Sequence, residues 1–157
     1  INFEIKENEI IGLLGPNGSG KTTTIGMILG LLKPTSGEVL INGIKIEKNP
    51  IEILQKINFI SPYIELPKKL TVKQNLIVYG KLYSVKNLNE KIDYLVSKLR
   101  LENLLNRVTG ELSSGQKNRI SLAKAIINDP SVLLLDEPTA SLDPEIGDFV
   151  RTFLENY

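Results

Sequence analysis

The sequence predicts an α/β fold with a mostly parallel sheet, a small antiparallel β region and an inserted helical subdomain. Two short apolar runs, at residues 10–14 and 132–135, have the continuous hydrophobicity of strands buried in a parallel sheet. Between them, apolar residues recur at helical spacing over residues 72–83 and 88–99. A length of 157 residues with 41% apolar residues suits one folded domain.

The N-terminal part is predicted to lead into a loop and a helix. Residues 2–6 alternate apolar and polar side chains, as a half-buried strand does, and residues 9–14 form the first buried strand. A glycine-rich loop at residues 15–20 follows at once. Residues 21–32 then predict a helix that ends at the Lys-Pro break after it.

The remaining elements follow in order along the chain. An Asn-Gly dipeptide between two apolar runs predicts a hairpin over residues 38–46. A short apolar run at residues 57–60 predicts another strand, and the two helical stripes follow it. A further helix is expected from Leu112 to near Asp129, and a last helix over residues 144–157 begins with proline.

The composition excludes several classes of site. The 19 basic and 18 acidic residues leave a formal net charge of +1, so no overall positive field draws the chain to nucleic acid. Without any cysteine the chain has no disulfide, thiolate metal site or cysteine nucleophile, which fits the cytoplasm. Its apolar runs are shorter than the ~20 residues that a membrane-spanning helix needs. We expect a soluble domain that binds anions through a local site.

The glycine-rich loop predicts that local site, because residues 15–22 match G-x-x-x-x-G-K-[ST] at every fixed position. Glycines let consecutive backbone N–H groups point inward around a phosphate, and the following helix adds its N-terminal dipole. Lys21 would neutralise the β- and γ-phosphates of ATP, and the Thr22 hydroxyl would bind Mg²⁺. A glycine turn that binds nothing is the alternative, and the strand before it and helix after it disfavour that alternative. The residues predicted to bind nucleotide are Gly15, Pro16, Asn17, Gly18, Ser19, Gly20, Lys21, Thr22 and Thr23.

An acidic pair follows the apolar run at residues 132–135. Asp136 comes at the carboxyl end of the strand, where ligands collect in parallel sheets, and can hold Mg²⁺ directly or through water. Glu137 can polarise the water that attacks the γ-phosphate. Alone, such a strand could simply end in solvated acids. Together with the phosphate loop it predicts ATP hydrolysis, with Glu137 as the catalytic base.

Two further segments resemble the ATP-binding cassette (ABC) family. Residues 112–116 are similar to the signature motif of that family, which usually has glycine where Ser114 stands, and residues 136–143 are similar to its Walker B segment and D-loop. The resemblance covers essentially the whole chain and implies a P-loop NTPase core, the ABC ATPase domain. It assigns residues 1–62 and 130–157 to the nucleotide-binding core and residues 63–129 to the helical insertion. The signature residues are Leu112, Ser113, Ser114, Gly115 and Gln116, and the D-loop residues are Ser141, Leu142 and Asp143.

The family resemblance implies a dimer. Two such domains sandwich two ATP molecules, and each site combines the phosphate loop of one domain with the signature of the other. On this pattern Ser113 and the Gly115 N–H would contact the γ-phosphate of ATP held by the second domain. Without the family, the same five residues would predict an ordinary helix cap.

The sequence departs from the family pattern in three places. Ser61 and Pro62 stand where the family has a glutamine after the strand at residues 57–60, so the loop at residues 61–65 is only a candidate partner contact. Gln74 is near, but it lies within a helical stripe. The adenine-stacking aromatic residue and the switch histidine would fall beyond the two ends, so the sequence resembles a domain trimmed at both.

The resemblance implies the ATPase subunit of an ABC transporter, cytoplasmic and peripheral at the inner face of the cell membrane. Its partners would be a second ABC ATPase domain, identical or different, and a transmembrane permease subunit, with no nucleic acid. A soluble ABC ATPase of translation or repair is the alternative, although the stretch between Lys21 and Leu112 has no coiled-coil heptads. A regulatory cassette that binds ATP without hydrolysis is disfavoured by Glu137. The transported substrate is not predicted.

Overall fold

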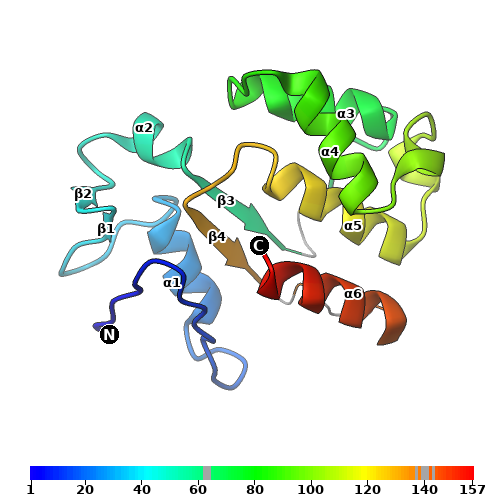
Figure 1. The fold of residues 1–157 in the computed structure, drawn as a ribbon. Helices are drawn as coiled ribbons and strands as arrows, with labels where there is room; N and C mark the ends of the chain where they lie inside the picture. The colour runs from blue at the N-terminus through cyan, green and yellow to red at the C-terminus, as the bar shows by residue number, and fades with distance from the viewer. Residues whose placement is uncertain (62–64, 137, 139–141, 143) are drawn as a thin grey trace. The chain divides into compact units, whose positions relative to one another are not determined.

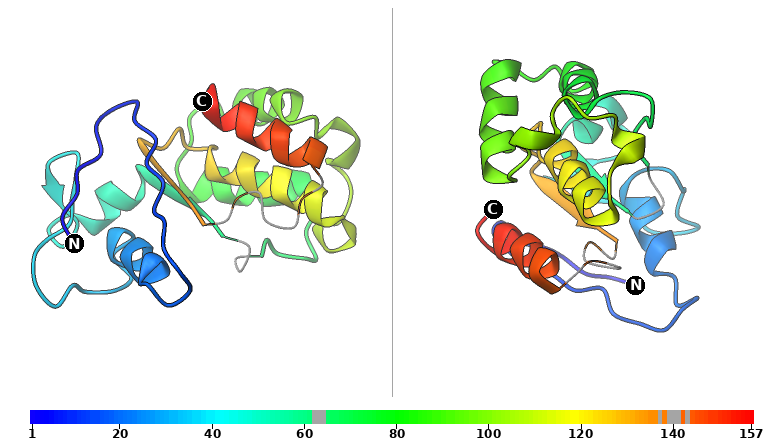
Figure 2. Two further views of the ribbon diagram at one scale, coloured as in Figure 1. Left: turned by 90° about the horizontal axis from the view of Figure 1, so that it is seen from below. Right: turned by 90° about the vertical axis from the view of Figure 1, so that its right-hand side faces the viewer.

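The structure, a computed structural model, describes residues 1–61, 65–136, 138, 142 and 144–157 (Figures 1 and 2). The chain divides into two compact units, residues 1–48 and 49–157, and each is considered by itself. No helix in the described part of the chain is long and apolar enough to cross a membrane.

The first unit contains one helix and one hairpin. Helix α1 spans Lys21–Ile28, and strands β1 (Leu40–Ile41) and β2 (Ile44–Lys45) pair antiparallel. The turn between them has positive φ at both central residues, 51° at Asn42 and 75° at Gly43, which is the geometry that an Asn-Gly dipeptide favours. The predicted hairpin is therefore confirmed.

Helix α1 is shorter than predicted because a glycine ends it. Gly30 has φ 68°, its N–H donates to the carbonyl of Met27 (3.0 Å), and the N–H of Leu31 donates to the carbonyl of Gly26 (2.9 Å). These two hydrogen bonds around a left-handed residue form a Schellman motif. The helix therefore ends at Ile28, before the Lys-Pro break that predicted its end.

The two strands predicted near the N-terminus are absent, so both predictions were wrong. Neither residues 2–6 nor residues 9–14 belong to a strand, and Ile10 and Leu14 are 78% and 93% exposed. A strand needs a neighbour whose backbone groups accept and donate its hydrogen bonds. No described strand pairs with either segment, so the apolar pattern alone did not produce one.

The second unit contains a two-stranded parallel sheet and most of the helices. Strands β3 (Ile57–Ile60) and β4 (Val132–Leu135) pair in the register Ile57 with Val132. Helix α5 lies against β3, helix α3 against α5, and helix α4 against α3. The helices are α2 (Pro50–Leu54), α3 (Val72–Leu82), α4 (Leu88–Lys98), α5 (Ser114–Ala125) and α6 (Pro144–Glu155), with 3-10 turns η1 (Glu102–Leu104) and η2 (Thr109–Glu111).

Helix α6 lies beside α5 in Figures 1 and 2. The contact is close at Gly115, where an added Cβ would lie 2.5 Å from Ile146 Cδ1. Both predicted strands of this unit, the two central helices and the last helix are confirmed, with ends that differ by a few residues.

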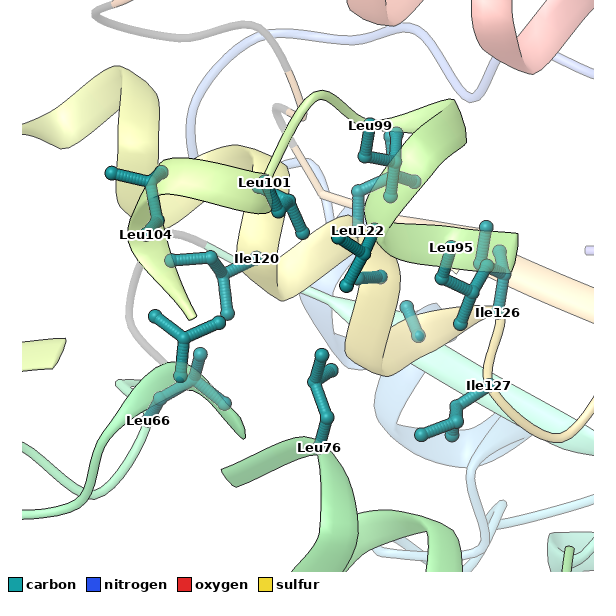
Figure 3. Close-up of a cluster of buried hydrophobic side chains, with 14 of the residues drawn as sticks. Leu66, Leu76, Leu95, Leu99, Leu101, Leu104, Ile120, Leu122, Ile126 and Ile127 are labelled. Atoms are coloured by element: carbon teal, nitrogen blue, oxygen red, sulfur yellow. The ribbon is translucent and has the colours of Figure 1, made fainter. Parts of the chain in front are cut away.

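The core of the second unit forms where α3, α4 and α5 meet (Figure 3). Leu76, Leu95, Ile120 and Leu122 are completely buried there. Burial of a side chain of this size contributes about 1.5–3 kcal/mol relative to exposure. The helical stripes of the sequence are therefore core positions, as their periodicity predicts.

Candidate functional site

The loop at residues 15–20 has a backbone that requires its glycines. Gly18 and Gly20 have φ of 81° and 95°, in the left-handed region that side chains disfavour. A Cβ at Gly15 would lie 2.5 Å from Ser19 Oγ, and the N–H of Ser19 donates to the carbonyl of Pro16 at 3.1 Å. Conformation thus favours glycine at Gly18 and Gly20, whereas a side chain at Gly15 would displace the Ser19 hydroxyl.

Helix α1 begins directly at this loop and offers amide donors to it. Gly20 is the N-cap residue and supplies no capping side chain, and the first turn has no acidic residue. The N–H groups of Lys21, Thr22 and Thr23 have no acceptor inside the helix, as is general for the first turn. Together with the positive end of the helix dipole, these donors favour an anion. Thr22 and Thr23 are both exposed.

The ammonium of Lys21 lies over the same loop. Its Nζ donates to the carbonyls of Gly15 at 2.8 Å and Pro16 at 3.0 Å. A lysine ammonium has three donors and can exchange carbonyl oxygens for phosphate oxygens. The predicted loop residues and Lys21 therefore lie together in one unit, and their binding of phosphate stays a prediction.

Asp136 lies at the carboxyl edge of the parallel sheet, as predicted. Its N–H donates to the carbonyl of Ile60 at 2.9 Å, so it continues the β3–β4 pairing by one residue, and it is half-buried. Ser61, which follows β3 at the same edge, is buried. The predicted base, Glu137, lies outside the described residues.

The predicted metal site combines a hydroxyl and a carboxylate. Such oxygens are the ligands that Mg²⁺ accepts, together with phosphate oxygens and water, so Thr22 and Asp136 fit this ion chemically. No three His, Cys, Asp or Glu side chains of the described residues form a cluster that would hold a metal without further ligands. Thr22 belongs to the first unit and Asp136 to the second, and their meeting in one site stays a prediction.

The signature segment forms the start of α5. Ser113 Oγ accepts the N–H of Gln116 (3.3 Å), and Gln116 Oε1 accepts the N–H of Ser113 (3.1 Å), which is a capping box. Leu112 is buried, whereas Ser113 and Ser114 are exposed at the helix start. The segment is therefore the helix cap that its residues predict, and it presents a hydroxyl and first-turn amides to solvent.

The D-loop prediction falls mostly outside the described residues. Ser141 and Asp143 are not among them, and Leu142 is half-buried against the apolar core of the second unit.

Two residues that the sequence analysis passed over tie the signature helix to its neighbours. Asn118 Nδ2 donates to the carbonyl of Pro138 at 2.8 Å, which joins α5 to the segment after Asp136. Arg119 Nη1 donates to the carbonyls of Leu99 (3.3 Å) and Arg100 (3.1 Å), where α4 ends. Their position two and three residues after Gln116 was the available signal, but their acceptors are 19 or 20 residues away.

A buried polar cluster anchors α5 to β3. Asn58 is 3% exposed, and its Oδ1 accepts from Lys124 Nζ at 3.0 Å and from the N–H of Phe59 at 2.9 Å. Its Nδ2 donates to Asn128 Oδ1 at 3.0 Å. Burial lowers the pKa of the Lys124 ammonium, which also lies 5.3 Å from the centre of the Tyr79 ring. A polar residue within the apolar run at 57–60 was the only sequence signal for this cluster.

The loop, the acid at the sheet edge and the signature helix together are features of nucleotide-binding P-loop domains. The family model described as ABC transporter matches residues 1–140 of the chain. The chain therefore belongs to the ABC transporter family, and its fold is the P-loop NTPase fold of the ABC ATPase domain.

Several relatives by sequence are ATP-binding proteins of transport systems. The chain is 39% identical to the Nod factor export ATP-binding protein I of Burkholderia lata, over 92% of the chain and 48% of that protein. It is 41% identical to the bacitracin transport ATP-binding protein BcrA of Bacillus licheniformis, over 92% of the chain and 47% of that protein. The chain thus spans about half the length of these relatives.

Solved structures share the fold. The ATP-binding cassette MJ0796, in a dimeric post-hydrolysis state bound to ADP and Pi, has a TM-score of 0.87 at 31% identity, over 98% of this chain and 71% of that chain. CbiO1 from Clostridium perfringens, part of the ABC transporter complex cbiONQ, has a TM-score of 0.84 at 32% identity, over 99% of this chain and 64% of that one.

Proposed function

We propose that the whole protein binds and hydrolyses ATP and thereby powers the transport of a substrate across a membrane. The observation that carries this proposal is the loop at residues 15–20, whose left-handed glycines, first-turn amides and overlying Lys21 form an anion site. The names of the relatives, which describe ATP-binding proteins of export and transport systems, support the use of ATP to power transport.

The chemistry divides among few side chains. The loop amides and Lys21 bind the β- and γ-phosphates and hold the γ-phosphate in place, while Thr22 and Asp136 hold Mg²⁺, which neutralises charge on these phosphates. Glu137 orients the attacking water and accepts its proton. The D-loop residues Ser141, Leu142 and Asp143 belong to the contact between two domains. Because phosphoryl transfer depends mainly on positioning and electrostatics, no covalent intermediate with the protein is needed.

The protein acts as a dimer in this proposal. Ser113 and the N–H of Gly115 contact the γ-phosphate held by a second ABC ATPase domain, which the exposure of Ser113 at a helix start supports. A solved relative at 31% identity is a dimer with ADP and Pi. We further propose that the dimer binds a membrane permease subunit and lies on the cytoplasmic side of the membrane. The transported substrate would be exported. Residues 1–62 and 130–157 act as nucleotide-binding core and residues 63–129 as helical insertion.

Replacement of the loop lysine tests the proposal. Lys21→Ala removes the cation over the loop, so we expect the whole protein to lose ATP turnover by about 100-fold or more, or to lose ATP binding. Lys33→Ala, at an exposed lysine of the same unit, is the matched control and should leave both unchanged. Unchanged ATP affinity and turnover in Lys21→Ala would show that the loop binds no nucleotide.

Replacement of the predicted base separates binding from chemistry. Glu137→Gln keeps the shape of the side chain and removes its charge, so ATP should still bind while hydrolysis falls by about 10²–10⁴-fold. An ATP-bound dimer should then accumulate and elute early in size-exclusion chromatography. Hydrolysis at the wild-type rate would assign the base to another residue.

A further inference from the structure

Two segments far apart in the sequence run side by side directly before the signature serine. Thr71 and Val108 form an antiparallel bridge. The N–H of Thr109 donates to the carbonyl of Leu70 at 2.9 Å, and the N–H of Gly110 donates to that of Lys68 at 3.0 Å. Residues 68–71 and 108–110 are thus joined by backbone hydrogen bonds, and only two residues separate Gly110 from Ser113.

The side chain of Asn75 lies at the centre of this junction. It is 1% exposed, and its Nδ2 lies 2.8 Å from Thr109 Oγ1 and 3.2 Å from the carbonyls of Pro67 and Thr71. Thr109 Oγ1 in turn donates to the carbonyl of Leu70 at 3.0 Å. One amide therefore binds both segments, and it adds a second donor to carbonyls that already accept backbone N–H groups, those of Leu70 at Pro67 (3.3 Å) and of Asn75 at Thr71 (2.9 Å).

The arrangement specifies asparagine rather than an apolar residue of similar size. Asn75 Oδ1 is buried and has no hydrogen-bond partner among the described residues. The reverse orientation of the amide would turn this oxygen toward the carbonyls of Pro67 and Thr71, which repel it. Burying the Oδ1 atom without a partner costs free energy that an apolar side chain would not cost. The favourable part of having asparagine here is therefore the set of hydrogen bonds that its Nδ2 donates.

Gly110 sets the separation of the two segments. A Cβ at this residue would lie 3.0 Å from the carbonyl oxygen of Lys68 and 3.3 Å from its Cβ. A side chain here would be accommodated only if Lys68 moved by a few tenths of an ångström. A buried amide and a closely packed glycine thus lie on the same short stretch of chain, which leads to the helix cap formed by Ser113.

We propose that Asn75, through Thr109, is a positioning residue that holds the signature segment, and with it Ser113, in the place where a nucleotide of a second domain is contacted. The inference rests on the proposed function and deepens it, because it names what fixes the signature within its own domain. Asn75 itself would not touch nucleotide.

The experiment compares isosteric variants in the whole protein. Thr109→Val keeps the shape of the side chain and removes the hydroxyl that Asn75 binds, whereas Thr109→Ser keeps the hydroxyl. We expect kcat at saturating ATP to fall about tenfold in Thr109→Val, with the Kd for ATP in the monomer within about twofold of wild type. Thr109→Ser should retain near wild-type kcat.

A second pair of variants covers the case that Thr109→Val folds poorly. Gly110→Ala should lower kcat in the same way, because the added methyl displaces the backbone at Lys68. Gly147→Ala is its control, since Gly147 lies in α6 and an added Cβ has nothing within 4 Å. Hydrogen exchange of the Gln116 amide, which donates to Ser113 Oγ, should accelerate in Thr109→Val and Gly110→Ala only.

The outcomes distinguish this inference from the function on which it rests. Unchanged kcat and unchanged Gln116 exchange in Thr109→Val and Gly110→Ala would overturn the positioning role. An equal loss of ATP binding and turnover in Thr109→Val and Thr109→Ser would also overturn it, because a general loss of structure would then explain both. If the wild-type protein shows no turnover that depends on Lys21, the proposed function fails, and the Gln116 exchange decides the positioning role alone.

Discussion

The phosphate loop and the signature segment differ in what shapes them. The loop at residues 15–20 takes its form from its own glycines and from the helix that follows, within about ten consecutive residues. The signature segment begins with a local capping box, but residues 68–75 on one side and the α4 end on the other hold it in place. One site is built by local conformation and the other by contacts between distant segments.

The loop therefore depends little on the rest of the chain for its shape, whereas the signature segment depends on residues distant in sequence. A backbone nest needs residues that tolerate positive φ, and glycine provides this wherever it stands. A serine at a helix start becomes a specific contact only when the helix itself is fixed. Polar side chains such as Asn75 and Arg119 do this for α5, and their loss would affect the position of Ser113 without any change in the motif.

The largest difference between the two units is expected in the free energy of unfolding when a leucine of the 157-residue chain is replaced by alanine. Leu122 is completely buried, so Leu122→Ala should lower the free energy of unfolding by about 2–5 kcal/mol. Leu14 is 93% exposed, and Leu14→Ala should change it by less than about 0.5 kcal/mol. Urea unfolding measures both. Equal losses would show that residues 10–14 are packed in solution as firmly as the core of the second unit.

An intermediate effect on stability is expected at two helix ends, one in each unit, where a left-handed residue follows the helix. Gly30 after α1 and Ser84 after α3 are both left-handed, with φ of 68° and 54°. Gly30→Ala should weaken its helix end by about 1–2 kcal/mol, while Ser84→Gly should strengthen the other by up to about 1 kcal/mol.

Hydrogen exchange of the Leu29 and Tyr83 amides, which close the last turns of the two helices, reports each effect separately. A shift of the same sign at both sites would mean that left-handed strain does not decide the stability of these ends.

The smallest effect concerns the pH dependence of the second unit. Burial lowers the pKa of Lys124 below its ordinary value of 10.5, so the unfolded chain binds this proton more tightly than the folded chain. Stability should therefore rise as the pH increases from the folded pKa toward 10.5. Lys124→Met removes the titrating group and should flatten this rise, measured by urea unfolding at several pH values below 10.

Two tyrosines have the opposite effect on the pH dependence of stability and limit the pH range in which Lys124 can be measured. Burial raises the pKa of Tyr83 and raises that of Tyr157 to about 12, so their contribution to stability is lost as the pH climbs from 10 toward these values. Lys86→Met, at an exposed lysine, is the control and should keep the wild-type slope below pH 10. An identical slope in Lys124→Met and wild type would show that Lys124 titrates normally.

Sequence alone determined the elements whose reasons are local. The Asn-Gly turn fixed the hairpin, the 3.6-residue stripes fixed α3 and α4, and the fixed positions of the loop placed its glycines where positive φ is needed. Gln74 was correctly assigned to a helix, where it forms a capping box with Thr71. In each case a few neighbouring residues contain the whole physical cause.

Tertiary structure decided the rest, because the cause lay elsewhere in the chain. The pattern at residues 9–14 is that of a buried strand, yet a strand forms only with a paired neighbour, and none of the described strands pairs with it. Asn58 stands within an apolar run and Asn75 within a helical stripe, and neither sequence position indicates the carbonyls and ammonium that these side chains bind. Hydrogen bonds between residues tens of positions apart are set by how the chain packs, so only the folded structure identified the groups that hold Ser113 in place.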